Sequence, residues 1–331
     1  MPSPAVLKTS DFHYDLPPEL IASQPLEDRT ASRMMVINRA SGTIEHRSFR
    51  DFTSQLAEDD LLVLNDTKVV PARFFSNDGK IELMRLEELS PTRWRSMVRP
   101  GKKMKPGRTV SLGEATGTVI EVDAEGNRII DWDRAPDPSL GALALPHYME
   151  REPDASDEDR YQTTFAKNEG AIAAPTAGLH FTPEVLASLP HTFLTLHVGI
   201  GTFRPVKTEL VAEHHMHSEN YQLSEEAAGR IRANRGRTIA VGTTVTRVLE
   251  HLAATQADFP RATRGATDIF IHPPYQFKAI GGLLTNFHLP ESTLLMLVSA
   301  FASRDLMLEA YRQAVAERYR FYSYGDCMLI L

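Results

Sequence analysis

The chain has 331 residues, of which 42% are hydrophobic and 24% are charged, so it carries enough apolar material for a folded core and is not a disordered protein. Its net charge of −7 excludes a globally basic nucleic-acid-binding protein, so any role with nucleic acid requires a local basic patch. A single cysteine, Cys327, excludes an internal disulfide, and the lack of an apolar leader or a long apolar run predicts a cytoplasmic protein without membrane contact.

The first half of the chain divides into two patterns. Residues 1–70 mix helical turns, beginning at Pro17-Pro18, with short strands. Residues 71–146 contain no convincing helix, and their Gly-containing turns separate short strand-like runs. These six runs span residues 72–76, 80–87, 93–99, 109–112, 116–122 and 127–132. Runs at this spacing predict a small antiparallel barrel or sandwich.

The second half alternates strands and helices after a polar, acidic segment, residues 150–160, that we expect to be a linker. The predicted strands cover residues 192–198, 238–241, 268–272 and 328–331, with Phe321 pairing to the last, and the predicted helices cover residues 224–235, 244–254 and 291–317. The simplest fold class is therefore mixed α/β. Residues 1–70 and 147–331 form the main domain, and residues 71–146 form an inserted six-stranded antiparallel β-barrel. The length of the chain also favours two domains.

Two loops have small residues that allow a ligand to approach the backbone. The stretch Pro175–Phe181 places Thr176 and Gly178 beside His180, just before a helix start at Thr182-Pro183. An ordinary loop before a helix explains this stretch equally well.

The stretch His197–Phe203 directly follows a strand and contains Gly199, Gly201 and Thr202. It lacks the third glycine of a dinucleotide-binding fingerprint. The end of a strand in an α/β sheet is nevertheless the usual place for a ligand, and the alternative is a tight turn.

The stretch His214–Glu219 is rich in histidine. On a strand, His215, His217 and Glu219 would share one face, where they could bind a metal or pair an imidazole with a carboxylate for proton transfer. No second ligand pair follows at a recognisable spacing, which weakens the zinc interpretation. A surface histidine run, or a Glu219 that pairs with an arginine, remains the alternative.

Two further stretches place polar groups at element ends. Thr243 and Thr244 open a helix that carries Arg247 one turn later, which suits an anionic group, although helix capping also explains Thr243. Asn286 and His288 interrupt an apolar segment, and buried polar groups of this kind require a partner.

One stretch of the predicted barrel is strongly basic. Residues 93–108 surround Trp94 with cations and contain no acidic residue, which is typical of a phosphate-binding surface. A solvated barrel edge is the alternative. The cations are Arg93, Arg95, Arg99, Lys102, Lys103, Lys105 and Arg108.

Together these segments closely resemble one family, the S-adenosylmethionine:tRNA ribosyltransferase-isomerases of queuosine biosynthesis. The matching stretches are Asp11–Pro17, Leu64–Arg73, Arg99–Lys102, Ala174–Thr182, Leu196–Val206, His215–Tyr221, Val241–Glu250, Leu283–Phe301 and Tyr324–Asp326. The resemblance implies an α/β domain with an inserted barrel. It also implies transfer of the ribosyl part of S-adenosylmethionine to 7-aminomethyl-7-deazaguanine at the wobble position of a tRNA anticodon, giving epoxyqueuosine, adenine and methionine.

The chain departs from the family pattern at three positions. Pro274 stands where Gly is expected, Gly281 where Asp is expected and His147 where Pro is expected. The segment between Phe181 and His197 is also shorter than usual. Gly281 puts in doubt a catalytic role for an acid at that position.

The implied reaction defines the candidate site residues. A sulfonium acidifies the adjacent ribose C5′ hydrogens, so the reaction needs a base at C5′ and a general acid for the departing adenine. The catalytic candidates are His217, Glu219, His180, His197 and Asp66. The substrate-binding candidates are Asn65, Arg73, Thr176, Gly178, Gly199, Gly201, Thr202, Thr243, Thr244, Arg247, Tyr275, Phe277, Asn286 and His288, with Tyr275 and Phe277 stacking on the purine or facing the sulfonium.

The basic stretch 93–108 is the candidate tRNA-binding surface. We expect a monomer with no permanently bound cofactor and no metal, because the consumed S-adenosylmethionine brings its own reactive cation. Two other classes stay open at this point. One is a metal-dependent nucleotide hydrolase that uses His214–Glu219, and the other is a non-catalytic RNA-binding protein that uses the basic insert.

Overall fold

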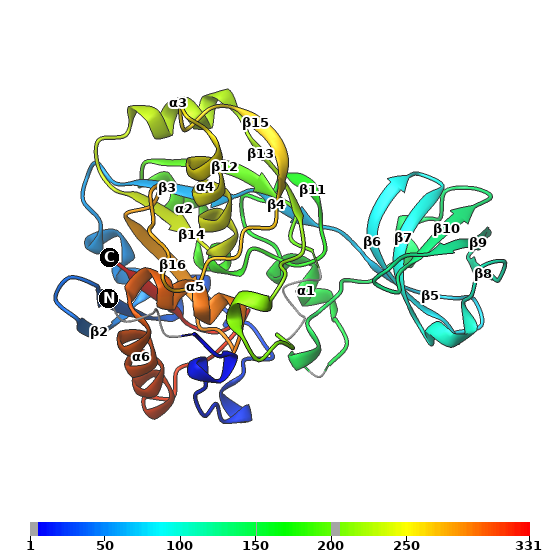
Figure 1. Ribbon diagram of the computed structural model, residues 1–331, viewed down its shortest axis with the longest axis horizontal. Coiled ribbons are helices and arrows are strands. Elements are labelled where there is room, and N and C mark those ends of the chain that lie inside the picture. Colours follow the sequence, from blue (N-terminus) through cyan, green and yellow to red (C-terminus); the bar gives the residue numbers. More distant parts are fainter. Residues whose placement is uncertain (1–5, 150, 200–205) are drawn as a thin grey trace.

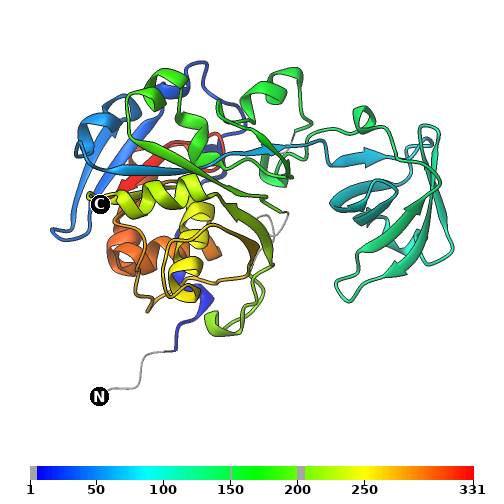
Figure 2. The same cartoon turned by 90° about the horizontal axis from the view of Figure 1, so that it is seen from above.

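The computed structural model describes residues 6–149, 151–199 and 206–331. A large α/β body contains a nine-stranded sheet, and a smaller all-β barrel lies to one side of it (Figures 1 and 2). The strand order of the large sheet is β15 (Thr263–Thr267), β13 (Glu219–Leu223), β12 (His191–Leu196), β3 (Leu61–Asn65), β14 (Thr238–Val241), β16 (Gly282–Asn286), β17 (Cys327–Ile330), β1 (Arg33–Asn38) and β2 (Thr43–Ser48).

The centre of the large sheet is parallel. β12, β3, β14 and β16 run in the same direction, so their carboxyl ends meet at one edge. β17 pairs with β16 in the antiparallel sense, and β1 runs parallel to β17. Every residue of β3 is buried, as expected for a parallel strand covered on both faces.

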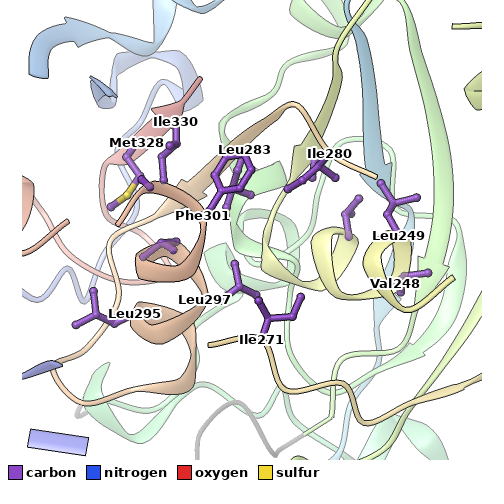
Figure 3. Close-up of a cluster of buried hydrophobic side chains, with 14 of the residues drawn as sticks. Val248, Leu249, Ile271, Ile280, Leu283, Leu295, Leu297, Phe301, Met328 and Ile330 are labelled. Atoms are coloured by element: carbon purple, nitrogen blue, oxygen red, sulfur yellow. The ribbon is translucent and has the colours of Figure 1, made fainter. Parts of the chain in front are cut away.

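Helices cover one face of this sheet (Figure 1). They are α3 (Glu225–Ala233), α4 (Thr243–Thr255), α5 (Thr293–Ala302) and α6 (Arg304–Ala316). Figure 3 shows Val248 and Leu249 of α4 and Leu297 and Phe301 of α5 in one buried cluster with Leu283 of β16. Because α5 is apolar on nearly all sides, it can only be stable as a buried helix.

The opposite face is covered by shorter elements. Phe49 and Phe52 of a 3₁₀ helix pack against Phe181, which precedes α2 (Pro183–Ala187). The Thr182 side chain caps α2 by accepting a hydrogen bond from the Val185 N–H, as the Thr-Pro start predicts. A helix of one and a half turns, α1 (Ala155–Arg160), and a two-stranded pair, β4 (Thr67–Val69) with β11 (Asn168–Ala171), complete the body.

The barrel sheet is antiparallel and nearly closed. Its strand order is β5 (Arg73–Phe75), β6 (Glu82–Ser90), β7 (Arg93–Arg99), β10 (Arg128–Trp132), β9 (Ala115–Val122) and β8 (Thr109–Leu112). The two edges meet where the Asn77 N–H donates to the Ser111 carbonyl at 2.9 Å. Trp94 and Trp132 fill the interior with ring centroids 5.1 Å apart, because alternate residues of each strand point inward.

These observations confirm a mixed α/β fold with a six-stranded antiparallel barrel sheet, and they confirm most predicted elements within two or three residues of their ends. Three predictions are wrong. Residues 268–272 are not a strand, because β15 ends at Thr267. The expected linker contains α1, and Phe321 forms an isolated bridge with Ile21 instead of pairing with β17.

Candidate functional site

A cavity of about 450 Å³ opens at the carboxyl edge of the central parallel strands. β14 and β16 end at this edge, and α4 and α5 both begin there. Gly242, at φ +95°, makes the sharp exit from β14 into α4, a conformation that other residues rarely adopt. Five of the predicted substrate-binding residues line the cavity, namely Thr176, Thr243, Thr244, Asn286 and His288.

The beginning of α4 supplies hydrogen-bond donors to the cavity. No side chain caps this helix, and the first N–H groups of a helix have no partner within it. The Thr244 hydroxyl is buried and has no hydrogen-bond partner in the described part of the chain. Donors at a helix start favour an anion, so this end of the cavity suits a carboxylate.

Asn286 and His288 lie on another side of the cavity. The Asn286 side-chain N–H₂ donates to the Tyr322 carbonyl at 2.9 Å, and its buried Oδ1 has no partner among the described residues. His288 Nε2 lies 3.1 Å from the Thr285 hydroxyl. Burial lowers the pKa of His288 to about 3, so its imidazole is neutral at pH 7. Both side chains can therefore exchange hydrogen bonds with an uncharged heterocycle.

His180 is buried and does not line the main cavity. Its Nδ1 lies 3.0 Å from the Ser32 hydroxyl. Burial lowers the pKa of His180 to about 4, partly opposed by its contact with Asn286. His180 also lines a second, much smaller cavity of about 20 Å³ together with Arg29 and Arg160.

Aromatic residues that the sequence analysis did not single out line the main cavity. Tyr148, Tyr161 and Tyr322 belong to segments far apart in the sequence. By contrast, Tyr275 and Phe277 are not part of the lining, since they pack beside α4 and α5 through Glu250 and Phe301. The sequence did offer one signal for Tyr322, because it lies two residues before Tyr324–Asp326, a stretch that resembles the family.

Glu219 forms a buried ion pair instead of a strand-borne pair with His217. Its carboxylate binds Arg247 Nη1 and accepts a hydrogen bond from the Gly199 N–H at 3.0 Å. The prediction that His215 and His217 share a strand face with Glu219 is wrong, because β13 begins only at Glu219. His217 instead lies 3.9 Å from Glu125, which belongs to a barrel turn.

Asp66 and His197 are brought together where β3 and β12 end. Asp66 accepts hydrogen bonds from Thr195 and Asn168, and His197 Nδ1 lies 2.9 Å from the Thr67 hydroxyl. Burial lowers the pKa of His197, and the charge of Asp66 partly opposes this effect. Val198, the next residue after His197, lines the cavity.

Several predicted substrate-binding residues have other roles in the structure. The Asn65 amide ties β3 to β12 through both backbone groups of Leu196. Gly178 packs tightly against Thr163, and Arg73 forms ion pairs with Glu82 and Glu152 at the barrel.

Two predicted substrate-binding residues, Gly201 and Thr202, lie outside the described residues. Gly281 lies at the amino end of β16, opposite the edge that forms the cavity. The residue at position 281 therefore does not contribute to the lining of the cavity.

The basic stretch divides into paired and unpaired cations. Arg93 pairs with Asp131, and Arg95 with Asp123, so neighbouring strands neutralise both. The others are exposed and form no ion pair within the described part of the chain. They are Arg99, at the end of β7, and Lys102, Lys103, Lys105 and Arg108, on the connection from β7 to β8.

Two classes of site are not found among the described residues. No group of three or more histidine, cysteine, aspartate or glutamate side chains is placed to hold a metal ion there. Within the same part of the chain, no helix has the length and apolar character needed to cross a membrane.

The chain is similar to known proteins over almost its full length. Residues 9–330 match a family described as queuosine biosynthesis protein. S-adenosylmethionine:tRNA ribosyltransferase-isomerases of Caldanaerobacter subterraneus and Symbiobacterium thermophilum are 48% and 49% identical, each over 98% of this chain and 100% of the relative. The crystal structure of a Thermotoga maritima S-adenosylmethionine tRNA ribosyltransferase is 39% identical, covers 97% of this chain and 100% of that chain, and superposes with a TM-score of 0.56.

Proposed function

This chain belongs to the queuosine biosynthesis protein family, and we propose that it is an S-adenosylmethionine:tRNA ribosyltransferase-isomerase. The reaction transfers the ribosyl part of S-adenosylmethionine to 7-aminomethyl-7-deazaguanine in the tRNA anticodon and rearranges it to give epoxyqueuosine. Adenine and methionine are released. The observation that carries this proposal is 47–49% identity to enzymes of that name over nearly the whole chain.

We propose that the cavity at the carboxyl edge of the sheet holds S-adenosylmethionine. Its volume of about 450 Å³ lies in the range of small-molecule sites. The free donors at the start of α4, with Thr243 and Thr244, suit the methionine carboxylate. Asn286 and the neutral His288 suit the edge of the adenine, because each can form hydrogen bonds without introducing charge.

The proton transfers need groups near the reacting ribose. Glu219 is the group we propose to test first, since it bonds to Gly199, whose neighbour Val198 lines the cavity, and His217 is a separate candidate. His197, beside Asp66, is a second candidate for proton transfer, because it is also adjacent in sequence to Val198. His180 contacts Asn286 and Ser32, and these contacts suit a positioning role behind the adenine site.

The barrel, residues 71–146, is the proposed tRNA-binding domain. Five of its exposed cations form no ion pair with the described residues and can neutralise backbone phosphates, whereas Arg93 and Arg95 already have acidic partners. The reaction chemistry requires no metal, because the sulfonium supplies the electrophile. We also propose that the protein is cytoplasmic, which its single cysteine suits, and that it acts as a monomer.

Adenine release tests the proposal. The protein is incubated with S-adenosylmethionine and tRNA carrying 7-aminomethyl-7-deazaguanine, and adenine is quantified by chromatography. We expect one adenine per modified tRNA and the same rate with a chelator. Loss of turnover with the chelator, restored by one divalent ion, would favour a metal-dependent hydrolase, and tRNA binding without adenine release would favour a non-catalytic RNA-binding protein.

A further inference from the structure

Two tyrosine rings pack against each other at a tilt in the wall of the main cavity. The ring centroids of Tyr148 and Tyr322 are 3.9 Å apart, and the ring planes are inclined by 36°. Both residues line the cavity. The Tyr148 hydroxyl is hydrogen-bonded to Ser323, whereas the buried Tyr322 hydroxyl has no partner in the described part of the chain. Of the two hydroxyl groups, only that of Tyr148 is therefore fixed by a hydrogen bond to a described residue.

The backbone holds Tyr322 in an unusual conformation. Its φ of +73° lies in the left-handed region, which is uncommon for a bulky residue and costs of the order of 1–3 kcal/mol. Hydrogen bonds fix this conformation on both sides. The Tyr322 N–H donates to the Phe287 carbonyl at 3.2 Å, and the Tyr322 carbonyl accepts from Asn286 at 2.9 Å. Strain of this kind gathers at ligand sites, because a particular side-chain position is needed there.

The described lining of the cavity contains almost no charge. It includes no lysine or arginine, and His288 is neutral. Burial raises the pKa of both Tyr148 and Tyr322, so neither phenol ionises near pH 7. The acidic residue of the lining is Glu291, which is 43% exposed and lies 3.1 Å from His13. A cation bound deep in this cavity therefore faces neutral rings and dipoles.

We propose that the adjoining rings of Tyr148 and Tyr322 bind the sulfonium of S-adenosylmethionine through their electron-rich faces. This proposal rests on the function proposed above and assigns the cation-recognising part of the site. A sulfonium cannot donate a conventional hydrogen bond, whereas the quadrupole of an aromatic ring attracts it directly. The interaction strengthens as water is removed, and both rings are half-buried.

The test compares two competitive inhibitors of turnover with modified tRNA. S-adenosylhomocysteine has a neutral sulfur, and the aza analogue carries a protonated amine in the place of the sulfonium. Tyr322→Leu is expected to raise the inhibition constant of the cationic analogue about 3- to 30-fold more than that of S-adenosylhomocysteine, because only the cation loses the ring interaction. Tyr322→Phe keeps the ring and is expected to change the ratio of the two constants by less than about 2-fold.

A graded series guards against misfolding of the leucine variant. Phenylalanine bearing one, two or three fluorines at position 322 keeps the shape of the ring but withdraws its electron density. The inhibition constant of the cationic analogue should then rise stepwise, while that of S-adenosylhomocysteine stays constant. Tyr148→Leu tests the second ring in the same way.

Equal changes for both inhibitors would overturn the proposal, since they would mean that the rings pack on the uncharged adenine. A flat fluorine series would also overturn it. A wild-type protein that releases no adenine would instead contradict the proposed function, and the two failures are therefore distinguishable.

Discussion

In the body of the molecule several buried charges have specific partners, whereas five exposed cations of the barrel form no ion pair with the described residues. Glu219 pairs with Arg247, Asp60 pairs with Arg237, and Glu250 accepts hydrogen bonds from consecutive backbone N–H groups that begin at Lys278. The five barrel cations, Arg99 at the end of β7 and four residues on the connection to β8, face solvent.

This difference separates two physical tasks. A buried ion pair holds its partners in fixed positions and is insensitive to salt, which suits a site where reacting groups must be placed. Exposed, unpaired cations release counterions from a nucleic-acid backbone when they bind it, and this contribution depends strongly on salt. Turnover and stability should therefore depend on the buried charges of the body and on pH. The affinity of the barrel for tRNA should depend on ionic strength.

The largest effect is expected at Glu219. Loss of a proton-transfer group typically costs 10²–10⁴-fold, so Glu219→Gln should lower single-turnover adenine release by about that factor. The same change leaves Arg247 buried without its counter-ion, so the melting temperature should also fall. Glu226→Gln, an exposed change on α3, is the matched control and should alter neither quantity.

A double variant separates catalysis from stability. Glu219→Gln combined with Arg247→Met removes both charges and should recover much of the melting temperature. Turnover should stay low if Glu219 transfers a proton. Recovery of turnover together with stability would show that Glu219 serves only as the counter-ion of Arg247.

Asp157 is a second buried charge of the body. Burial alone would raise the pKa of Asp157, but hydrogen bonds from Arg151, the Asp154 N–H and Tyr324 outweigh it and lower this pKa. A lowered folded-state pKa contributes stability above the ordinary value of 3.8 and loses it as the pH falls through the folded-state pKa. Asp157→Asn should cost about 3 kcal/mol of unfolding free energy at pH 7.

Urea unfolding over a range of pH checks this expectation. The acid-induced loss of stability should be weaker in Asp157→Asn than in the wild type. The exposed Asp159, on the same helix, provides the control variant Asp159→Asn. Equal acid sensitivity of the wild type and Asp157→Asn would contradict the assignment.

The barrel cations should affect tRNA binding through salt. Each phosphate contact contributes about 0.7–0.9 to the slope of log affinity against log salt, so Arg99, Lys102 and Lys103→Ala should flatten the slope by about 2–3. The affinity near 0.1 M salt should fall by about 10²-fold. Binding is measured by fluorescence anisotropy across a salt series.

The paired arginines give the control. Arg93 and Arg95→Ala should change the slope by less than about 1, because Asp131 and Asp123 already neutralise them. An unchanged slope in the triple variant, or an equal change in both, would break the distinction between paired and unpaired cations.

The smallest effect is expected at the start of α4. Thr244→Val keeps the shape of the side chain but removes the unpartnered hydroxyl. Because a hydrogen bond to a charged group contributes about 1.5–3 kcal/mol, the KM for S-adenosylmethionine should rise roughly tenfold or more. Thr255→Val at the other end of α4 is the control, and an unchanged KM in Thr244→Val would place the carboxylate elsewhere.

Local patterns were sufficient to predict most of the fold. The barrel strands follow from period-two alternation, since the residues of β7 alternate between exposed or half-buried and buried. The start of α3 follows from Ser224, which caps it. β16 was missed, because a strand buried on both faces has no alternation and the polar Thr285 and Asn286 interrupt its apolar run, whereas the equally buried β17 is wholly apolar.

The site was predictable only in part. Thr243 and Thr244 line the cavity and follow the end of the predicted strand 238–241, which is a local signal. Asn286 and His288 also line it, and their signal was polarity within an apolar segment. Partner choice is not local, because Glu219 and Arg247 meet only when β13 packs beside α4. The buried Asp157 was missed, because it lies in a polar segment that we expected to be a linker. One of its partners, Arg151, is near in the sequence, but the other, Tyr324, is distant.

Nucleoside mass analysis of the tRNA tests most directly whether this protein transfers the ribosyl group. The wild-type protein is incubated with S-adenosylmethionine and tRNA carrying 7-aminomethyl-7-deazaguanine, and the tRNA is then digested. Epoxyqueuosine should appear only when S-adenosylmethionine is present, in proportion to the adenine released. Recovery of the unchanged aminomethyl nucleoside from folded, tRNA-bound protein would contradict the proposed activity.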